Sequence, residues 1–105
     1  MEKCITKEEV IVGKKWKDIK GDTQSKEIVL KHYDNGDLEI DGYFSGTLIE
    51  ESMGDWDYEF GMKIAQKDAD KFLEILRSVD DPTRIYVIEK LCEEESIETN
   101  FWSWA

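Results

Sequence analysis

The chain has 105 residues, a length that fits a single domain with its own hydrophobic core. Its formal net charge is −11, from 25 acidic against 14 basic residues, while 40% of its residues are hydrophobic. Such a charge repels the phosphates of nucleic acid and anionic membrane surfaces, so it excludes both as partners and favours a basic protein or a cation.

The first 24 residues carry the weakest secondary-structure pattern. Residues 10–12 (Val-Ile-Val) predict a short strand that ends at Gly13. The basic residues 14–17, followed by the polar residues 21–23, are typical of an exposed loop.

A hairpin is predicted from residue 27 onward. Residues 27–33 are rich in β-branched and aromatic side chains and predict a strand. The Asn35-Gly36 dipeptide indicates a tight turn. Residues 38–43 then alternate apolar with polar side chains, so the second strand has one dry face and one wet face.

The middle of the chain predicts a short helix and then a strand. Residues 48–53 fit a helix capped within residues 45–47 and stopped at Gly54. From residue 56 to residue 64, large apolar side chains alternate with Asp57, Glu59, Gly61 and Lys63. This strand is expected to place its apolar face on the core and its carboxylates outward.

Two helices and a last strand complete the chain. Residues 69–76 carry one apolar stripe and follow Asp68 as a candidate N-cap. Asp81-Pro82 is typical of a helix start, and that helix is expected to run through Cys92. Residues 97–101 alternate and predict a strand that continues into residues 102–104, where Trp102 and Trp104 share a face.

These elements predict an α+β fold. We expect an antiparallel sheet of about four to five strands with two to three helices packed on one face. No linker, repeat or low-complexity tract interrupts the chain, so residues 1–105 are expected to form a single domain.

The cysteines and the N-terminus indicate a cytoplasmic protein. Cys4 and Cys92 have no metal-type spacing around them, and both are expected to be reduced thiols, with Cys92 against the core. No apolar signal-peptide segment follows the charged residues 1–7. No run approaches the roughly 18 apolar residues of a membrane-spanning helix.

Catalysis is not supported by the residues. His32 lies inside a predicted strand, with no serine or cysteine near it in sequence to activate, so a structural role is favoured over that of a general base. One histidine and two distant cysteines do not make a zinc site, and no glycine-rich phosphate loop is present. Residues 34–37 lack the spacing of a calcium loop. We expect no enzyme, no metal and no cofactor.

The acidic side chains form two candidate partner-binding patches. The first combines the predicted short helix with the outer face of the following strand, and its members are Glu50, Glu51, Asp55, Asp57 and Glu59. The second follows the last helix and consists of Glu93, Glu94 and Glu95. Aromatic residues next to the first patch are candidate anchors, because interface energy concentrates in such side chains while complementary charge steers the encounter.

Three blocks carry a resemblance to known proteins: Gly-Asp-Leu-Glu-Ile-Asp-Gly at residues 36–42, Gly-Asp-Trp-Asp-Tyr-Glu-Phe at residues 54–60, and Phe-Trp-Ser-Trp at residues 101–104. With these blocks the chain resembles a set of small acidic uncharacterised bacterial proteins, which implies an α+β fold and a bacterial cytosol. In its size and acidity the chain is also loosely similar to the immunity proteins of bacterial toxin systems, including contact-dependent inhibition. That second similarity implies a cytosolic inhibitor of a basic toxin domain.

The function predicted from these observations is an immunity or antitoxin-type protein that binds a basic toxin domain and neutralises it by electrostatic and aromatic occlusion. An acidic binding or regulatory module with another partner stays open as an alternative, and a small divalent-metal enzyme is the third. A homo-oligomer also stays open, because an exposed sheet edge can pair two copies.

Overall fold

A computed structural model of the chain describes residues 4–46 and 57–104. Their central feature is a five-stranded sheet in the order β1-β2-β3-β4-β5, in which every neighbouring pair is antiparallel. The strands are β1 (Ile5–Lys17), β2 (Thr23–Tyr33), β3 (Leu38–Ser45), β4 (Asp57–Ile64) and β5 (Trp102–Trp104). Between β4 and β5 lie the 3₁₀-helix η1 (Gln66–Asp68) and the helices α2 (Ala69–Ser78) and α3 (Ile85–Glu94).

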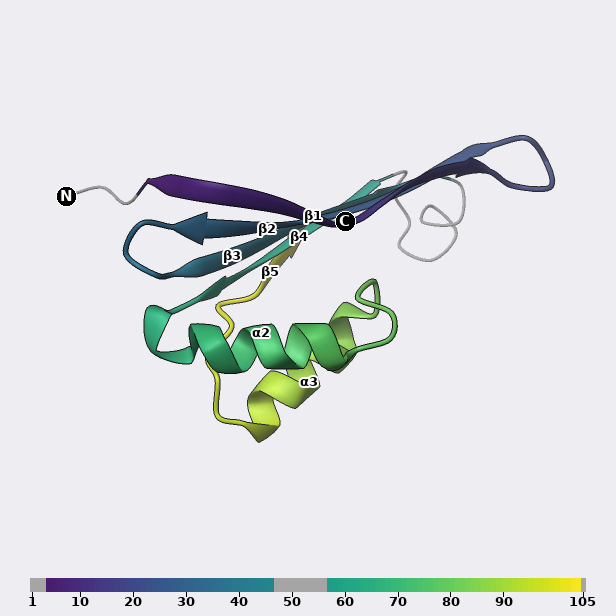
Figure 1. The fold of residues 1–105 in the computed structure, drawn as a ribbon. Coiled ribbons are helices and arrows are strands. Elements are labelled where there is room, and N and C mark those ends of the chain that lie inside the picture. Colours follow the sequence, from purple (N-terminus) through teal and green to yellow (C-terminus); the bar gives the residue numbers. More distant parts are fainter. Residues whose placement is uncertain (1–3, 47–56, 105) are drawn as a thin grey trace.

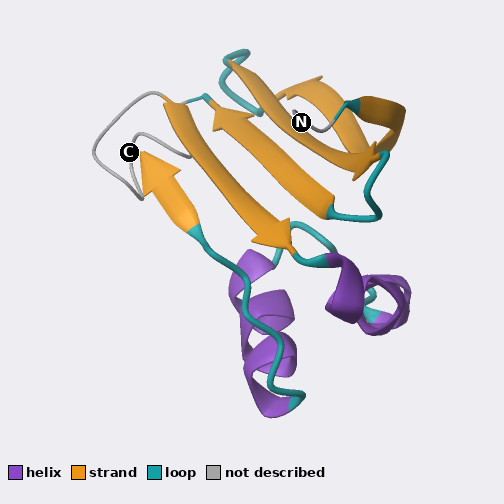
Figure 2. Ribbon diagram, turned by 90° about the vertical axis from the view of Figure 1, so that its left-hand side faces the viewer, coloured by secondary structure: helices purple, strands orange, loops and turns teal. Residues whose placement is uncertain are grey.

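The predicted α+β class is confirmed by this sheet and these helices. Figure 1 shows α2 and α3 on the same side of the sheet, and Figure 2 shows the short β5 at its outer edge beside β4. The helix predicted over residues 48–53 lies outside the described residues.

The hydrophobic core combines side chains of the sheet with side chains of the two helices. The side chains of β2, β3 and β4 alternate, and the buried apolar ones form one cluster with buried side chains of α2 and α3. Burying each large apolar side chain of this kind stabilises the fold by about 1.5–3 kcal/mol. The most deeply buried members of the core are Ile28, Leu30, Ile40, Phe60, Met62, Ile64, Phe72, Ile88 and Cys92.

The predicted hairpin between β2 and β3 is confirmed. The side-chain oxygen of Asn35 accepts the backbone N–H of Asp37 at 3.0 Å, which closes a local turn. Gly36 has a φ of 92°, a conformation that strains most other residues, and its N–H donates to the carbonyl of Tyr33 at 3.0 Å. The turn fixes the register in which His32 lies opposite Leu38.

The predicted loop over residues 14–17 is wrong. These residues continue β1, which passes through Gly13 and pairs with β2 as far as Lys17 opposite Thr23. The chain turns at residues 18–22 instead, where the Asp18 carboxylate accepts the N–H groups of Lys20 and Asp22 at 2.9 and 3.0 Å. Pairing with β2 outweighs the loop-like composition of the lysine run.

Helix α2 begins as predicted, whereas α3 begins later than predicted. Asp68 is the residue before α2, although its carboxylate makes no capping hydrogen bond. The predicted start at Asp81-Pro82 is wrong, because α3 begins at Ile85. The Asp81 carboxylate accepts both the N–H and the hydroxyl of Thr83, at 3.0 and 2.6 Å, and this turn holds the chain out of the helix.

The last strand is shorter than predicted. Only Trp102–Trp104 is strand, and residues 97–101 are not. Asn100 has a φ of 44°, which breaks the extended backbone, while the carbonyl of Thr99 accepts the N–H of Lys63 at 2.8 Å. The chain therefore reaches the edge of β4 before the regular pairing begins.

The two thiols differ in access, and we expect them to differ in reactivity. Cys92 is fully buried in α3, as predicted, and burial raises the pKa of its thiol to about 11, whereas Cys4 is exposed. Because the thiolate is the reactive form, a thiol reagent should label Cys4 rapidly and Cys92 only when the protein unfolds. Peptide mass spectrometry over a labelling time course measures both rates. Equal rates in the native protein would contradict this packing, and equal rates in denaturant are the control.

Candidate partner-binding face

The sheet has one face turned away from α2 and α3, which we call the open face (Figure 1). The strand register aligns its side chains in rows that cross the sheet. One row runs from Glu27 through Tyr43 to Glu59, and the next runs from Val29 through Asp41 to Gly61. Residues that are far apart in sequence therefore meet on one surface.

The open face is acidic over the middle of the sheet. On β2, β3 and β4 it carries five carboxylates and two lysines. The carboxylates are Glu27, Glu39, Asp41, Asp57 and Glu59, and the lysines are Lys31 and Lys63. Glu8 joins them from β1, since it lies opposite Lys31.

A shallow hollow of about 420 Å³ lies on this face. It extends from β1 to β5, and its lining side chains include Glu8, Glu27, Val29, Lys31, Asp41, Tyr43, Glu59 and Trp102. The indole of Trp102 lies over Gly61, where an added Cβ would come within 2.4 Å of the indole nitrogen. The absence of a side chain at Gly61 is what lets the ring lie against the sheet.

The charges in the hollow are only partly paired. Lys31 and Asp41 form an ion pair at 2.5 Å, and this hydrogen bond raises the pKa of Lys31. Glu8, Glu27 and Glu59 make no ion pair with any residue that the structure describes. The hollow thus offers carboxylates that a basic partner can pair.

Tyr43 is the most exposed aromatic residue of the hollow. Its hydroxyl group already makes a hydrogen bond. Its side chain is 38% exposed, and its hydroxyl donates to the Asp57 carboxylate at 3.4 Å. Burial, followed by the charge of Asp57, raises the pKa of Tyr43. Tyr43 and Trp102 together give the acidic surface two large rings.

The sequence-predicted site residues fall in three places. Asp57 and Glu59 are exposed on the open face of β4, so their predicted outward orientation is confirmed. Glu50, Glu51 and Asp55 lie outside the described residues. Glu93, Glu94 and Glu95 are exposed at the end of α3, on the helix side of the sheet, and Glu95 pairs with Lys71 at 3.2 Å. Of the two predicted patches, the described members of the first, Asp57 and Glu59, are therefore not brought together with Glu93, Glu94 and Glu95.

Several residues of the open face are not among the site residues predicted from the sequence. They are Glu8, Glu27, Asp41, Tyr43 and Trp102. The alternation of residues 38–43 indicated a wet face there, but only the register shows that Tyr43 lies between Glu27 and Glu59. That alignment depends on pairing between distant segments, which no local pattern encodes.

Tyr33 and Glu39 make a second tyrosine–carboxylate contact on the open face. The Tyr33 hydroxyl donates to Glu39, and loss of that bond on ionisation raises the pKa of Tyr33 to about 12. Because the folded pKa lies above the ordinary value near 10, the stabilisation is complete below about pH 10 and is lost as the pH rises through about 12. Glu39→Gln should move the pKa of Tyr33 back toward 10, as followed by the ultraviolet absorbance of tyrosinate. Glu27→Gln on the same face is the control, and an unchanged titration in the Glu39 variant would contradict the contact.

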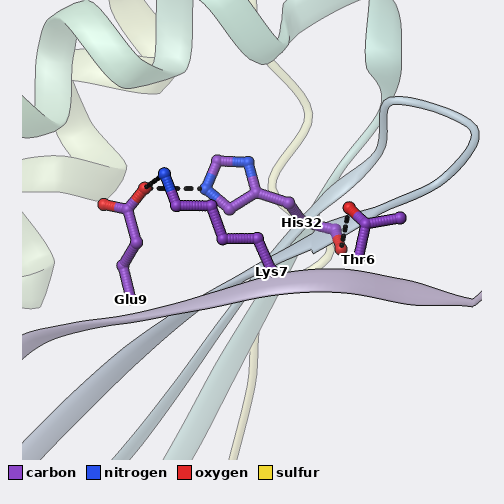
Figure 3. A network of polar contacts seen from close by, with 4 residues as sticks. All are labelled: Thr6, Lys7, Glu9 and His32. Atoms are coloured by element: carbon purple, nitrogen blue, oxygen red, sulfur yellow. Dashed lines mark hydrogen bonds and ion pairs between the residues drawn. The ribbon is translucent and has the colours of Figure 1, made fainter.

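His32 belongs to a polar network on the other face of the sheet (Figure 3). Its Nε2 lies 3.2 Å from a Glu9 carboxylate oxygen, which also accepts from Lys7 at 2.8 Å. The hydrogen bond from Lys7 is the main cause that lowers the pKa of Glu9, with His32 adding to it. Thr6 donates to the carbonyl of His32 at 3.3 Å. The network links β1 to β2, which agrees with the structural role predicted for His32.

Two further features concern residues 4–46 and 57–104, namely metal ligands and membrane-spanning helices. Within these ranges no three His, Cys, Asp or Glu side chains are grouped to hold a metal ion. None of the described helices has the length and apolar character needed to cross a membrane. Comparisons with protein-family models, with curated proteins and with solved structures find no match to the chain.

Proposed function

We propose that the protein is an immunity or antitoxin-type inhibitor that binds a basic toxin domain in the cytosol through the open face of its sheet. The observation that carries the proposal is the acidic hollow of that face, where Tyr43 and Trp102 lie among carboxylates, several of which form no ion pair with the residues that the structure describes. The inhibitor would act by occlusion, with its carboxylates opposite the lysines and arginines that the toxin uses to hold its substrate.

The arrangement of layers supports this use of the sheet. If the helices pack on one face only, as the sequence analysis predicts, α2 and α3 cover the buried core side chains of β2 to β4. The opposite face then carries no core residue and is free for a partner. Its side chains sit on paired strands, and a rigid scaffold of that kind lowers the entropy cost of binding.

The charge pattern supports a basic protein over other partners. Glu8, Glu27 and Glu59 lack ion pairs among the described residues, so a partner's cations would gain contacts without breaking internal ones. Trp102 and Tyr43 supply the ring surfaces in which interface energy usually concentrates. Unlike a purely solvating surface, this one combines charge, rings and a hollow.

A pull-down from an extract of the native bacterium tests the proposal. The tagged protein serves as bait at low and at high salt, and mass spectrometry identifies what is recovered. We expect one basic polypeptide at low salt and less of it at high salt, because screening slows a steered association. Addition of the protein should then inhibit the activity of that polypeptide.

Two outcomes would redirect the proposal. Recovery of no stoichiometric partner at either salt concentration would favour an acidic module whose charge is solvating. A rise in melting temperature with Ca²⁺, Mg²⁺ or Mn²⁺ would favour the divalent-metal enzyme, and we expect no such rise.

A further inference from the structure

We propose that two copies of the chain pair through the outer edges of their β1 strands, antiparallel, about a two-fold axis between Ile11 and Val12. β1 is an edge strand of 13 residues, and within the described part of the chain only β2 pairs with it. An edge strand presents a row of unpaired backbone N–H and C=O groups to a partner. The proposal requires no partner at the open face, although it uses Glu8, which also lines the hollow there.

The charges of β1 are complementary to themselves in this register. Two acids, Glu8 and Glu9, precede the apolar residues 10–12, and two bases, Lys14 and Lys15, follow them. Antiparallel pairing about the proposed axis sets Glu8 opposite Lys15 of the second copy and Glu9 opposite its Lys14. Symmetry repeats both contacts, so four opposite-charge pairs form across the edge, each of a kind that stabilises neighbouring strands.

A β-bulge makes these pairs geometrically consistent. Residues an odd number apart in a regular strand point to opposite faces, so Glu8 and Lys15 could not normally face each other across an edge. The register of β1 shifts between Val10 and Val12, and one extra residue there reverses the alternation. The closeness of Val10 and Gly13 on one face shows the shift, since an added Cβ at Gly13 would lie 3.2 Å from a Val10 methyl group.

The register with β2 confirms which face each charge takes. Glu8 and Lys15 lie opposite Lys31 and Ser25, which are open-face positions. Glu9 and Lys14 lie opposite Leu30 and Lys26, which are positions on the helix side. Each acid therefore shares a face with the base that it would meet in the second copy. A register shifted by two residues in one direction sets Lys7 against Lys14 and loses both contacts, and one shifted in the other direction sets Glu8 against Lys17 but loses the contact of Glu9, which then meets Trp16.

Glu9 already contacts Lys7 and His32, whereas the basic end of the edge has no such contacts with the described residues. Lys14 and Lys15 make no ion pair with any described residue. Val10 is 69% exposed in the middle of the strand. Lysines and bulges also protect edge strands from unspecific pairing. Protection alone does not explain why acidic residues stand at the positions that the proposed two-fold axis relates to the lysines. An edge whose charges are complementary to themselves can pair with a second copy, while it disfavours pairing with strands whose charges do not match.

Sedimentation equilibrium over micromolar to millimolar protein tests the proposal. We expect the mass to rise from 12.3 kDa toward twice that value, with association weakened by salt. Glu8→Lys/Glu9→Lys and Lys14→Glu/Lys15→Glu should each weaken self-association by about tenfold or more, because each sets like charges opposite one another. The control is Glu93→Lys/Glu94→Lys on α3, which changes the net charge by the same amount as Glu8→Lys/Glu9→Lys. This control should not weaken self-association.

Mixing the two reversed variants gives the decisive result. Each variant should be monomeric alone, with circular dichroism showing that it is folded, whereas an equimolar mixture should form a heterodimer in which all four pairs are restored. Folding damage could not be repaired by mixing. A wild-type chain that stays at 12.3 kDa up to millimolar concentration, or a mixture that stays monomeric, would overturn the proposal.

Discussion

Gly42→Ala is expected to destabilise the protein by about 3 kcal/mol, a large share of the stability of a domain of this size. Gly42 lies in β3 directly opposite Phe60, whose ring covers it. An added Cβ would lie 2.1 Å from the nearest ring carbon, and Phe60 is fully buried and in contact with Phe44, so it has no free space to move into. Urea unfolding measures the loss.

Gly13→Ala is the matched control for this prediction. Gly13 is also a strand glycine, but it is exposed at the edge of the sheet, and its new Cβ would meet only a methyl group of the exposed Val10 at 3.2 Å. The free energy of unfolding should change by less than about 0.5 kcal/mol. Equal effects at the two positions would show that the Phe60 ring does not lie on Gly42.

Gly61→Val is expected to displace Trp102 from the open face and to loosen β5. Valine favours strands, so propensity alone predicts a gain in stability. The structure predicts a loss of about 1–2 kcal/mol instead, because a Cβ at this position would lie 2.4 Å from the indole nitrogen of Trp102. Tryptophan fluorescence should shift toward that of exposed rings, and amide exchange should accelerate in Trp102–Trp104, which pairs with β4.

Lys63→Val provides the comparison on the same strand and the same face. Lys63 is exposed and lies opposite Glu39, two residues from Gly61. Valine there should leave the protection of Trp102–Trp104 unchanged. If Gly61→Val also left that protection and the fluorescence unchanged, the ring would not be seated on the glycine.

The sequence predicts the middle of the sheet well because its signals there are local. The alternation in β3 and β4 separates core from solvent, and the turn at Asn35-Gly36 is set by residues that contact one another. The apolar stripe of α2 likewise follows from spacing alone. These elements were placed correctly, with errors only at their ends.

The secondary-structure predictions are wrong where contacts between distant segments, or local side-chain and backbone geometry, determine the structure. Residues 14–17 look like a loop by composition, yet pairing with β2 makes them strand. Asp81 resembles a helix cap, but its bonds to Thr83 delay α3 until Ile85. The final strand is cut short at Asn100, whose backbone conformation no alternation pattern reveals.

The candidate site divides in the same way. The outward carboxylates Asp57 and Glu59 follow from the alternation of one strand. The row that joins Glu59 to Tyr43 and Glu27, and the position of Trp102 over Gly61, exist only through the sheet register and tertiary packing. The hollow therefore could not be predicted from the sequence.

The most direct test of the central claim compares three baits in the same extract at low salt. They are the wild-type protein, Asp57→Lys/Glu59→Lys on the open face and Glu93→Lys/Glu94→Lys on α3, and the two variants carry the same change in net charge. If the open face binds a basic partner, the first variant should lose at least about nine-tenths of the recovered polypeptide while its melting temperature stays near that of the wild type, and the second should retain it. Full recovery with the Asp57 and Glu59 variant, or loss only with the Glu93 and Glu94 variant, would contradict the claim.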